Sequence, residues 1–410
     1  YLVEKIEFND KYPVPPLLNQ RCLCYNYQMT KTSKTIGIDA RFYGPIGKGL
    51  GRYTQEIVDY LVKNDSEHQY VIFLNSHNFA NFPADGKRIR KVLADVPWYS
   101  LAEQIALPRL IKQHQIDLMH FPHFNVPIFC PVNFIVTIHD LILTKYPTVR
   151  ASTLSPVLYQ FKNLAYKLVI SRAIRQAQKI ITVSHFTKSD IVKHFGVKSD
   201  KVIVTYEGVA TLSAKSDSSN DSKAHLSRLK ISKAYLLYVG NAYPHKNLER
   251  LLQVTRPLLK RHNLQLVLVG KRDYFYQRLV NLTATWSKTD RQQVVFAGFV
   301  SDDTLDLLYR QALAYVFPSL YEGFGLPPLE AMSKLCPVVS SNRSSMPEIL
   351  GSAALYFDPE DNTDLPKQLE LLVTNTTLRQ SLIKLGEERV KLYNWTTCAK
   401  STLAVYQSVL

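Results

Sequence analysis

Short apolar runs rich in β-branched residues alternate along this chain with segments whose apolar positions recur at helical spacing. Tyr53, Ile57, Tyr60 and Leu61, for example, fall on one face of a predicted helix. Such alternation is typical of βαβ units and parallel sheets, so we predict an α/β protein. The strands expected in the first half are 35–39, 70–74, 117–121, 134–138, 179–183 and 202–205, and those in the second half are 235–239, 264–269, 294–297, 314–317, 337–340 and 354–357.

Changes in composition divide the chain further. The first residues include Pro13, Pro15 and Pro16 without a clear period, and the first methionine is Met29. Residues 211–224 are polar and rich in serine, which is typical of a linker. The predicted divisions are an irregular leader over 1–34, an N-terminal Rossmann-like domain over 35–210, a linker over 211–232, a C-terminal Rossmann-like domain over 233–390 and a helix over 391–410 that returns to the N-terminal domain.

A glycine-rich turn follows the first predicted strand and leads into a helix. Within Gly44-Pro-Ile-Gly47-Lys-Gly49-Leu-Gly51-Arg-Tyr53, we single out Gly47 and Gly49 as residues that let the backbone approach a phosphate. The alternative is an ordinary turn of an α/β fold, where glycines are common. The spacing does not match a Walker A loop, because no Lys-Ser or Lys-Thr pair closes it.

Lys246 follows the first strand of the second half after a glycine and a short turn. Ligands of doubly wound sheets bind beyond the carboxyl ends of the strands, so its ammonium group is placed to reach a pyrophosphate. On position alone, an ordinary surface lysine is the better interpretation.

Two carboxylates flank a Gly-Phe-Gly-Leu turn that enters a later helix. Glu322 precedes this turn and Glu330 follows it. The turn exposes successive backbone amides, which suit an anion or sugar hydroxyls, and each carboxylate can accept hydrogen bonds from two vicinal hydroxyls. The alternative is that both glutamates only stabilise the helix dipole.

The segment 294–332, which contains this turn, resembles the donor-site region of retaining glycosyltransferase family 4. The signature of that family is two glutamates separated by seven residues, matched here by Glu322 and Glu330. The resemblance implies a GT-B fold, in which two Rossmann-like domains enclose a cleft. It spans nearly the whole chain from Thr35 through the glycine-rich turn and the segments 137–141, 180–184, 239–247 and 346–348.

The resemblance also implies roles for individual residues. Glu330 would bind the donor ribose, Glu322 would lie at the transferred sugar, and Lys246 would bind the pyrophosphate. His139 matches the acceptor-side histidine near the reacting sugar, with a core or loop histidine as the alternative. The backbone amides offered to the sugar and phosphate would be those of Phe324, Gly325 and Leu326.

One position departs from the family pattern. Asn241 stands where many members carry an arginine that contributes to donor binding. We therefore expect the phosphate charge to fall mainly on Lys246, with help from Lys271 or Arg343. No DxD-like acidic cluster follows a strand, since Asp302-Asp303 begins a predicted helix. Lys246 and the amides would stabilise the leaving group in place of a metal, and no cofactor is expected.

The sequence indicates the type of reaction more clearly than it indicates the donor sugar and the acceptor. The segments 36–41, 137–140 and 240–247 look most like bacterial mannosyltransferases of surface-polysaccharide assembly, which favours GDP-mannose and a glycan or lipid-linked acceptor. A UDP-sugar-dependent glucosyltransferase is the alternative, and a GT-B nucleotide-sugar epimerase would share the donor site. Nucleic-acid binding is disfavoured, because aromatic residues do not interleave with a basic stripe.

The chain carries a net charge of +16, with 50 Lys and Arg against 34 Asp and Glu. Residues 141–189 contain eight Lys and Arg but no acidic residue. This segment is either the solvated face of a core helix or a contact surface for an anionic membrane. No apolar run reaches the ~20 residues that span a bilayer, and five scattered cysteines suggest a reducing compartment. The predicted location is cytoplasmic, with peripheral contact to the inner face of the membrane.

Overall fold

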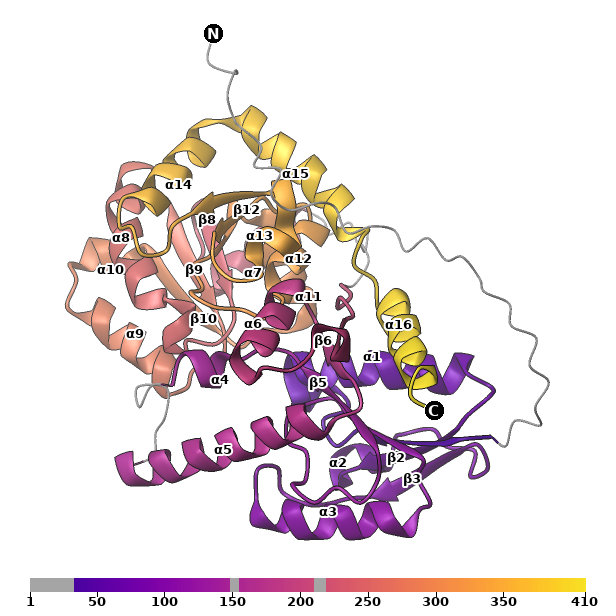
Figure 1. Cartoon of the computed structure of the whole chain (residues 1–410). Coiled ribbons are helices and arrows are strands. Elements are labelled where there is room, and N and C mark those ends of the chain that lie inside the picture. Colours follow the sequence, from indigo (N-terminus) through magenta and orange to yellow (C-terminus); the bar gives the residue numbers. More distant parts are fainter. Residues whose placement is uncertain (1–32, 148–154, 210–218) are drawn as a thin grey trace.

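The computed structural model describes residues 33–147, 155–209 and 219–410. The predicted leader therefore lies outside the described residues except for Ser33 and Lys34. Within the described ranges the helices and strands form two α/β domains, each built around one parallel sheet (Figure 1).

The N-terminal domain contains a seven-stranded sheet in the order β3-β2-β1-β4-β5-β6-β7. All its strand pairs are parallel, with Ile36 opposite Tyr70 on one side and Leu118 on the other. The central strands are buried on both faces, which explains their continuous apolar sequences. The strands are β1 (Thr35–Asp39), β2 (Gln69–Leu74), β3 (Ile89–Leu93), β4 (Leu118–Phe121), β5 (Phe134–Ile138), β6 (Ile180–Thr182) and β7 (Val202–Val204).

Helices connect these strands and cover both faces of the sheet. Two of them begin at residues that cap them, since Ser100 Oγ accepts from Glu103 N and Ser184 Oγ accepts from Thr187 N. The helices are α1 (Lys48–Asn64), α2 (Ser76–Phe79), α3 (Leu101–Gln113), α4 (Ile142–Lys145), α5 (Pro156–Gln176) and α6 (His185–Phe195).

The C-terminal domain contains a six-stranded parallel sheet in the doubly wound order β10-β9-β8-β11-β12-β13. Its strands are β8 (Tyr235–Val239), β9 (Gln265–Val269), β10 (Val294–Gly298), β11 (Ala314–Phe317), β12 (Val338–Ser341) and β13 (Ala354–Phe357). Its helices from α8 on are α8 (Leu248–Arg261), α9 (Tyr274–Ala284), α10 (Lys288–Gln292), α11 (Asp302–Gln311), α12 (Leu326–Ser333), α13 (Met346–Leu350), α14 (Asp364–Thr374) and α15 (Thr376–Val390).

Part of the segment expected as a linker is folded. Residues 211–218 lie outside the described residues, but α7 (Ser219–Arg228) is helical. Leu226, Leu229 and Ile231 pack into the core of the C-terminal domain, so that domain includes residues before 233. The linker was predicted from the polar residues 211–224, and its extension to residue 232 took in these three apolar positions.

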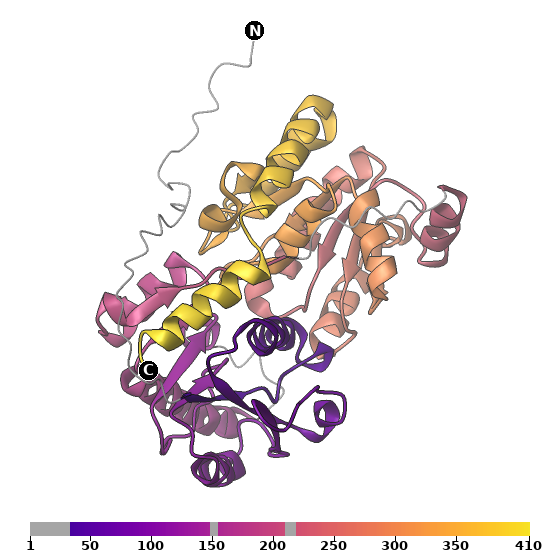
Figure 2. The ribbon, with the colours of Figure 1, turned by 90° about the vertical axis from the view of Figure 1, so that its right-hand side faces the viewer.

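The last helix, α16 (Trp395–Gln407), leaves the C-terminal domain and lies along α1 of the N-terminal domain (Figures 1 and 2). Its Tyr406 hydroxyl is 2.7 Å from Nδ1 of the buried His120. At its start, the ring of Trp395 lies 6.2 Å from that of Tyr53. The two domains are thus joined by a packed helix as well as by the chain between them.

Candidate active site

The loop after β5 and the turn after β11 meet between the two domains. Ser184 Oγ donates to the carbonyl oxygen of Gly323 at 2.6 Å. A Cβ atom added to Gly323 would lie only 1.9 Å from the carbonyl oxygen of His139. Glycine is therefore required here by the close approach of two backbones. The contact brings the predicted donor-side turn directly against the predicted acceptor-side loop.

Lys246 and Glu322, which come from separate sequence motifs, form an ion pair in this cleft. Lys246 Nζ lies 2.5 Å from Glu322 Oε1, and the two side chains are only 13% and 10% exposed. The turns that carry them are joined by the hydrogen bond from Leu320 N to His245 O. Because this pair is largely shielded from water, its two charges attract each other more strongly than those of a surface pair would.

The turn from Glu322 to Leu326 is held by two serines that precede α13. Glu322 N donates to Ser344 Oγ at 2.9 Å, and Ser345 Oγ donates to Glu322 O at 3.1 Å. Gly325 has a φ of +92° and immediately precedes α12. The amides of Phe324, Gly325 and Leu326 thus lie at the helix N-terminus, where amides have no intrahelical acceptor. This arrangement suits a phosphate or a sugar hydroxyl.

Glu330 lies one turn farther along α12 and faces the other domain. Its Oε1 is 3.3 Å from Arg52 Nη1 of α1, and its Oε2 accepts from the Tyr309 hydroxyl at 3.4 Å. Burial raises the pKa of Glu330, whereas the charge of Arg52 opposes that shift. Sequence reasoning did not select Arg52, although it directly follows the glycine-rich turn.

His139 is held by two acceptors rather than presenting a free nitrogen. Its Nδ1 is 2.9 Å from Glu207 Oε1 and its Nε2 is 3.0 Å from the carbonyl oxygen of Pro122. A carbonyl oxygen and a carboxylate both accept, so this arrangement favours a proton on each ring nitrogen. Burial alone lowers the pKa of His139, but the hydrogen bond and charge of Glu207 outweigh it and leave the pKa raised. Glu207 is thus a partner of His139 that the sequence did not reveal.

Asp140 lies between the residues of the two domains. Burial raises its pKa, and the negative charge of Glu322 adds to this effect, while His139 and Lys246 act in the opposite direction. A Cβ atom added to Gly323 of the donor-side turn would lie 3.0 Å from Asp140 Cβ. The loop after β5 therefore contributes a carboxyl group as well as a histidine to the cleft.

The remaining predicted residues lie in different surroundings. Gly47 is tightly packed, since a Cβ there would approach Phe42 O at 2.4 Å, whereas Gly49 has open space. Asn241 contacts only its own turn in these two hydrogen bonds: the Tyr238 hydroxyl donates to its carbonyl oxygen, and Tyr243 N donates to its Oδ1. Of the two helper cations, Arg343 pairs with Asp358 and Glu360, while Lys271 is exposed.

Two parallel-sheet domains that enclose such a cleft define the GT-B class of glycosyltransferases. Residues 221–389 match the family model for glycosyl transferases group 1, and residues 47–211 match the model for Glycosyltransferase Family 4. The chain is similar to O-antigen chain mannosyltransferase RfbU of Salmonella typhimurium, with 30% identity over 272 residues, or 66% of this chain and 68% of the relative. The chain therefore belongs to the glycosyltransferases of family 4.

Further similarities support this assignment. O-antigen chain mannosyltransferase B of Escherichia coli is 28% identical over 380 residues, which cover 88% of this chain and 96% of the relative. Among solved structures, sucrose-phosphate synthase from Thermosynechococcus elongatus has a TM-score of 0.70 at 19% identity and covers 92% of this chain and 99% of that chain. WaaG, a glycosyltransferase involved in lipopolysaccharide biosynthesis, has a TM-score of 0.66 at 15% identity, covering 90% and 99%. At these identities the structures show the fold alone.

Proposed function

We propose that this glycosyltransferase is a retaining, metal-independent mannosyltransferase that moves mannose from GDP-mannose to a glycan or lipid-linked acceptor in surface-polysaccharide assembly. Two relatives, both named as O-antigen chain mannosyltransferases, support the sugar and the pathway class. The observation that carries the reaction is the shielded Lys246–Glu322 pair beside the N-terminus of α12.

The chemistry follows from where charge develops. As the bond from the sugar carbon to the diphosphate breaks, its electron pair passes to the phosphate oxygen. Lys246 and the amides that begin α12 would stabilise that oxygen, and fixed donors of this kind are usually the largest catalytic contribution. Retention follows if the acceptor hydroxyl attacks from the face that the diphosphate leaves, with its proton passing to the departing phosphate. Glu330 would bind the ribose.

Nucleotide release from a panel of sugar nucleotides tests this proposal. We expect the fastest release from GDP-mannose, undiminished by excess EDTA, and an α-linked product from the α-configured donor by NMR. Release of UDP from UDP-glucose alone would instead identify a glucosyltransferase. Conversion of a sugar nucleotide to its epimer without a new glycosidic bond would identify an epimerase, and a gel shift with RNA or DNA at physiological salt would revive nucleic-acid binding.

The ribose assignment predicts a specific loss in Glu330→Ala. The parent should bind GDP more tightly than 2′,3′-dideoxy-GDP, because only GDP offers both hydroxyls to the carboxylate. A hydrogen bond to a charged group contributes about 1.5–3 kcal/mol, so the variant should bind GDP roughly 10- to 150-fold more weakly in calorimetry. The difference between the two nucleotides should also disappear. Equal discrimination in parent and variant would place the ribose elsewhere, and Glu360→Ala serves as the exposed control.

We also propose that the N-terminal domain contacts an anionic membrane through a basic apolar face. Along α5, Phe161, Leu164 and Leu168 form one stripe and are 68%, 66% and 57% exposed. The face continues through Phe129, whose ring lies 5.2 Å from the Arg172 guanidinium. Its members are Leu101 and Ile105 of α3, Phe129, and Phe161, Lys162, Leu164, Lys167, Leu168 and Arg172 of α5.

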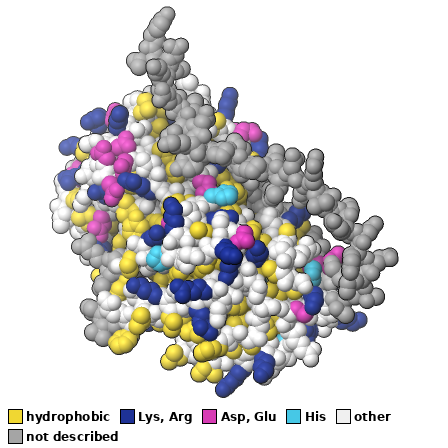
Figure 3. Space-filling model, in the orientation of Figure 1, with side chains coloured by type: hydrophobic (Ala, Val, Ile, Leu, Met, Phe, Trp, Pro, Cys, Tyr) yellow, Lys and Arg dark blue, Asp and Glu magenta, His cyan; other side chains and the backbone are white. Residues whose placement is uncertain are grey.

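Hydrogen bonds connect α5, the segment around Phe129 and α3 along this face. Arg172 Nε donates to Ile128 O at 2.7 Å, and Ile128 N donates to Gln104 Oε1 of α3 at 2.8 Å. Figure 3 shows apolar and basic side chains over the lower part of the molecule, where α3 and α5 lie. The acidic residues between 101 and 189 are Glu103, Asp117 and Asp140. Glu103 is buried, Asp117 pairs with Lys34, and Asp140 faces the cleft. Apolar groups among basic ones suit anionic headgroups.

Flotation with liposomes tests the membrane contact. In 0.1 M salt the protein should float with phosphatidylglycerol-containing liposomes and remain below phosphatidylcholine liposomes. Binding should fall at 1 M salt, where the Debye length decreases from ~10 to ~3 Å. The triple variant Phe161→Ser, Leu164→Ser, Leu168→Ser should lose flotation, whereas Leu371→Ser with Leu392→Ser, exposed in the C-terminal domain, should not. If the parent does not float with anionic liposomes, the basic side chains form only the solvent-exposed face of a core helix.

A further inference from the structure

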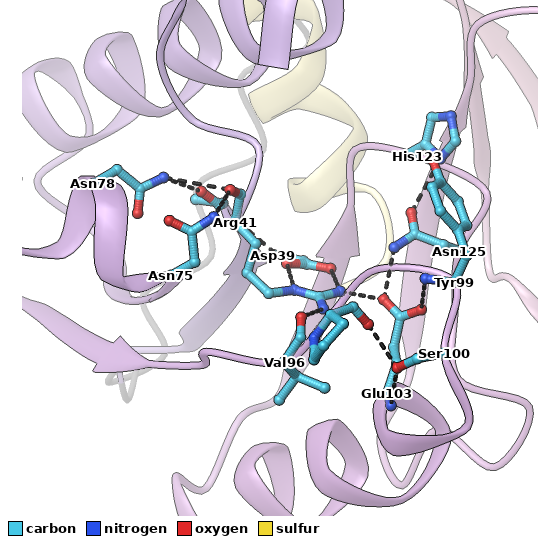
Figure 4. Close-up of polar contacts among 12 residues, drawn as sticks. Asp39, Arg41, Asn75, Asn78, Val96, Tyr99, Ser100, Glu103, His123 and Asn125 are labelled. Carbon is cyan, nitrogen blue, oxygen red and sulfur yellow. Dashed lines mark hydrogen bonds and ion pairs between the residues drawn. The ribbon is translucent and has the colours of Figure 1, made fainter. Parts of the chain in front are cut away.

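Three charged side chains are buried together behind the carboxyl end of β1 (Figure 4). Arg41 donates to both oxygens of Asp39 at 2.7 Å and to Glu103 Oε1 at 2.5 Å, and none of the three is more than 3% exposed. A buried network of this kind is weak evidence for a stabilising role, because apolar residues of similar volume often serve as well. The network also holds residues of neighbouring segments in place.

Glu103 holds two neighbouring segments at once. Its Oε2 accepts from Tyr99 N at 2.9 Å, and its Oε1 accepts from Asn125 Nδ2 at 2.8 Å. Asn125 Oδ1 in turn lies 3.0 Å from His123 Nδ1 (Figure 4). The carboxylate that Arg41 fixes thus orients both Tyr99, in the loop before α3, and His123, just after β4.

Tyr99 adopts a conformation that its own packing does not explain. Its φ is +59°, a region that non-glycine residues rarely occupy, yet its side chain is 60% exposed. Backbone strain of this kind costs about 1–3 kcal/mol and persists where the surroundings impose it, frequently at functional sites. The hydrogen bond to Glu103 imposes it here and displays the tyrosine ring to solvent.

His123 presents one free nitrogen beside that ring. Burial lowers its pKa to about 3, and the positive charge of His139 contributes, so the ring is neutral. Because Asn125 donates its amide group to Glu103, its Oδ1 must accept from His123 Nδ1. The lone pair of Nε2 has no hydrogen-bond partner among residues 33–147, 155–209 and 219–410, so it can accept from a ligand hydroxyl.

The two rings adjoin the reaction centre. Their centroids are 6.0 Å apart, and Phe124 packs against both. His139 Nε2 bonds to Pro122 O, the residue before His123. Asp140, the residue after His139, lies beside Gly323 of the donor-side turn, 3.0 Å from a Cβ atom added to that glycine.

We propose that Tyr99 and His123 form the site that binds a pyranose ring of the acceptor, with the ring's apolar face against Tyr99 and one hydroxyl donated to His123 Nε2. An aromatic body with a hydrogen-bonding rim matches the apolar face and polar edge of such a sugar. Asp39, Arg41, Glu103 and Asn125 are positioning residues for this site. The inference rests on the proposed function, because an acceptor exists only if the enzyme transfers its sugar.

Kinetics with simple acceptors test this site. The probes are methyl α-mannoside and the methyl glycosides of glucose, galactose and N-acetylglucosamine, with GDP-mannose and UDP-glucose as donors. We expect Tyr99→Ala and His123→Ala to raise the acceptor KM at least 10-fold, while donor hydrolysis without acceptor is unchanged. Tyr99→Phe should keep a KM close to that of the parent, and the exposed Tyr274→Ala is the matched control.

A variant of a positioning residue should change the acceptor KM alone. Glu103→Gln should raise the acceptor KM as Tyr99→Ala does, with kcat at saturating acceptor and the donor KM retained, which a general loss of folding would not produce. An unchanged acceptor KM in Tyr99→Ala and His123→Ala, or a parent that hydrolyses donor but transfers to none of the glycosides, overturns the inference. A parent that releases nucleotide from no donor, with or without acceptor, overturns the proposed function itself.

Discussion

Lys246→Ala should lower the kcat of nucleotide release by about 10²- to 10³-fold, the range found when one donor to a developing negative charge is removed. The ammonium group acts on the leaving diphosphate, so the ranking of sugar donors should stay the same. Steady-state release from GDP-mannose and UDP-glucose measures both quantities. Lys260→Ala, on the exposed surface of α8, is the control for loss of a lysine charge.

The pairing with Glu322 must be separated from this effect. Removing Lys246 leaves a carboxylate that is only 10% exposed without its partner, which can destabilise the protein as well. The double variant Lys246→Met with Glu322→Gln should recover most of the melting temperature without recovering kcat. If the double variant regains activity, or if the parent requires Mg²⁺ or Mn²⁺ for any turnover, the lysine is not the group that stabilises the leaving phosphate.

Most of the two sheets could be predicted because parallel strands are buried on both faces. Such strands are continuous apolar runs, and β9 (Gln265–Val269) shows this with Leu-Val-Leu-Val. The strand that escaped prediction is β3 (Ile89–Leu93), which lies at the edge of its sheet. Arg90 and Lys91 are only half-buried there, so no apolar run marks it. An edge strand can satisfy its pairing with one neighbour while its side chains remain polar.

The sequence selected candidate site residues one by one but not the pairs that they form in the structure. Lys246 and Glu322 each follow a strand, and the sheet order then brings them together although 76 residues separate them. Arg52 is 278 residues from Glu330, and only the packing of the two domains against each other joins them. Glu207 follows the last strand of its sheet, without a motif that links it to His139. Contacts of this kind depend on tertiary packing that local periodicity does not contain.

Gly323→Ala should disrupt the packing of the two domains against each other. The added Cβ would lie 1.9 Å from His139 O and 3.0 Å from Asp140 Cβ. The first of these atoms belongs to the backbone, so no side-chain rotation relieves the clash and the domains must separate. A displacement of ~1 Å at a reacting centre costs about 10²-fold in rate, so kcat/KM should fall at least that far. Scattering should show a larger radius of gyration that saturating donor no longer reduces to the parent's value.

A strained glycine outside the cleft provides the matched control for this prediction. Gly196 ends α6 with a φ of +65°, and a Cβ atom added to it would meet nothing within 4 Å, so Gly196→Ala should lower stability without moving the domains. If Gly323→Ala keeps the parent's kcat/KM while its melting temperature falls as in Gly196→Ala, the backbone contact between Gly323 and His139 is not needed for the reaction. If kcat/KM falls in Gly323→Ala alone, the approach of the loop after β5 to the donor turn is part of the reacting state, because closure both excludes water and aligns the reacting groups.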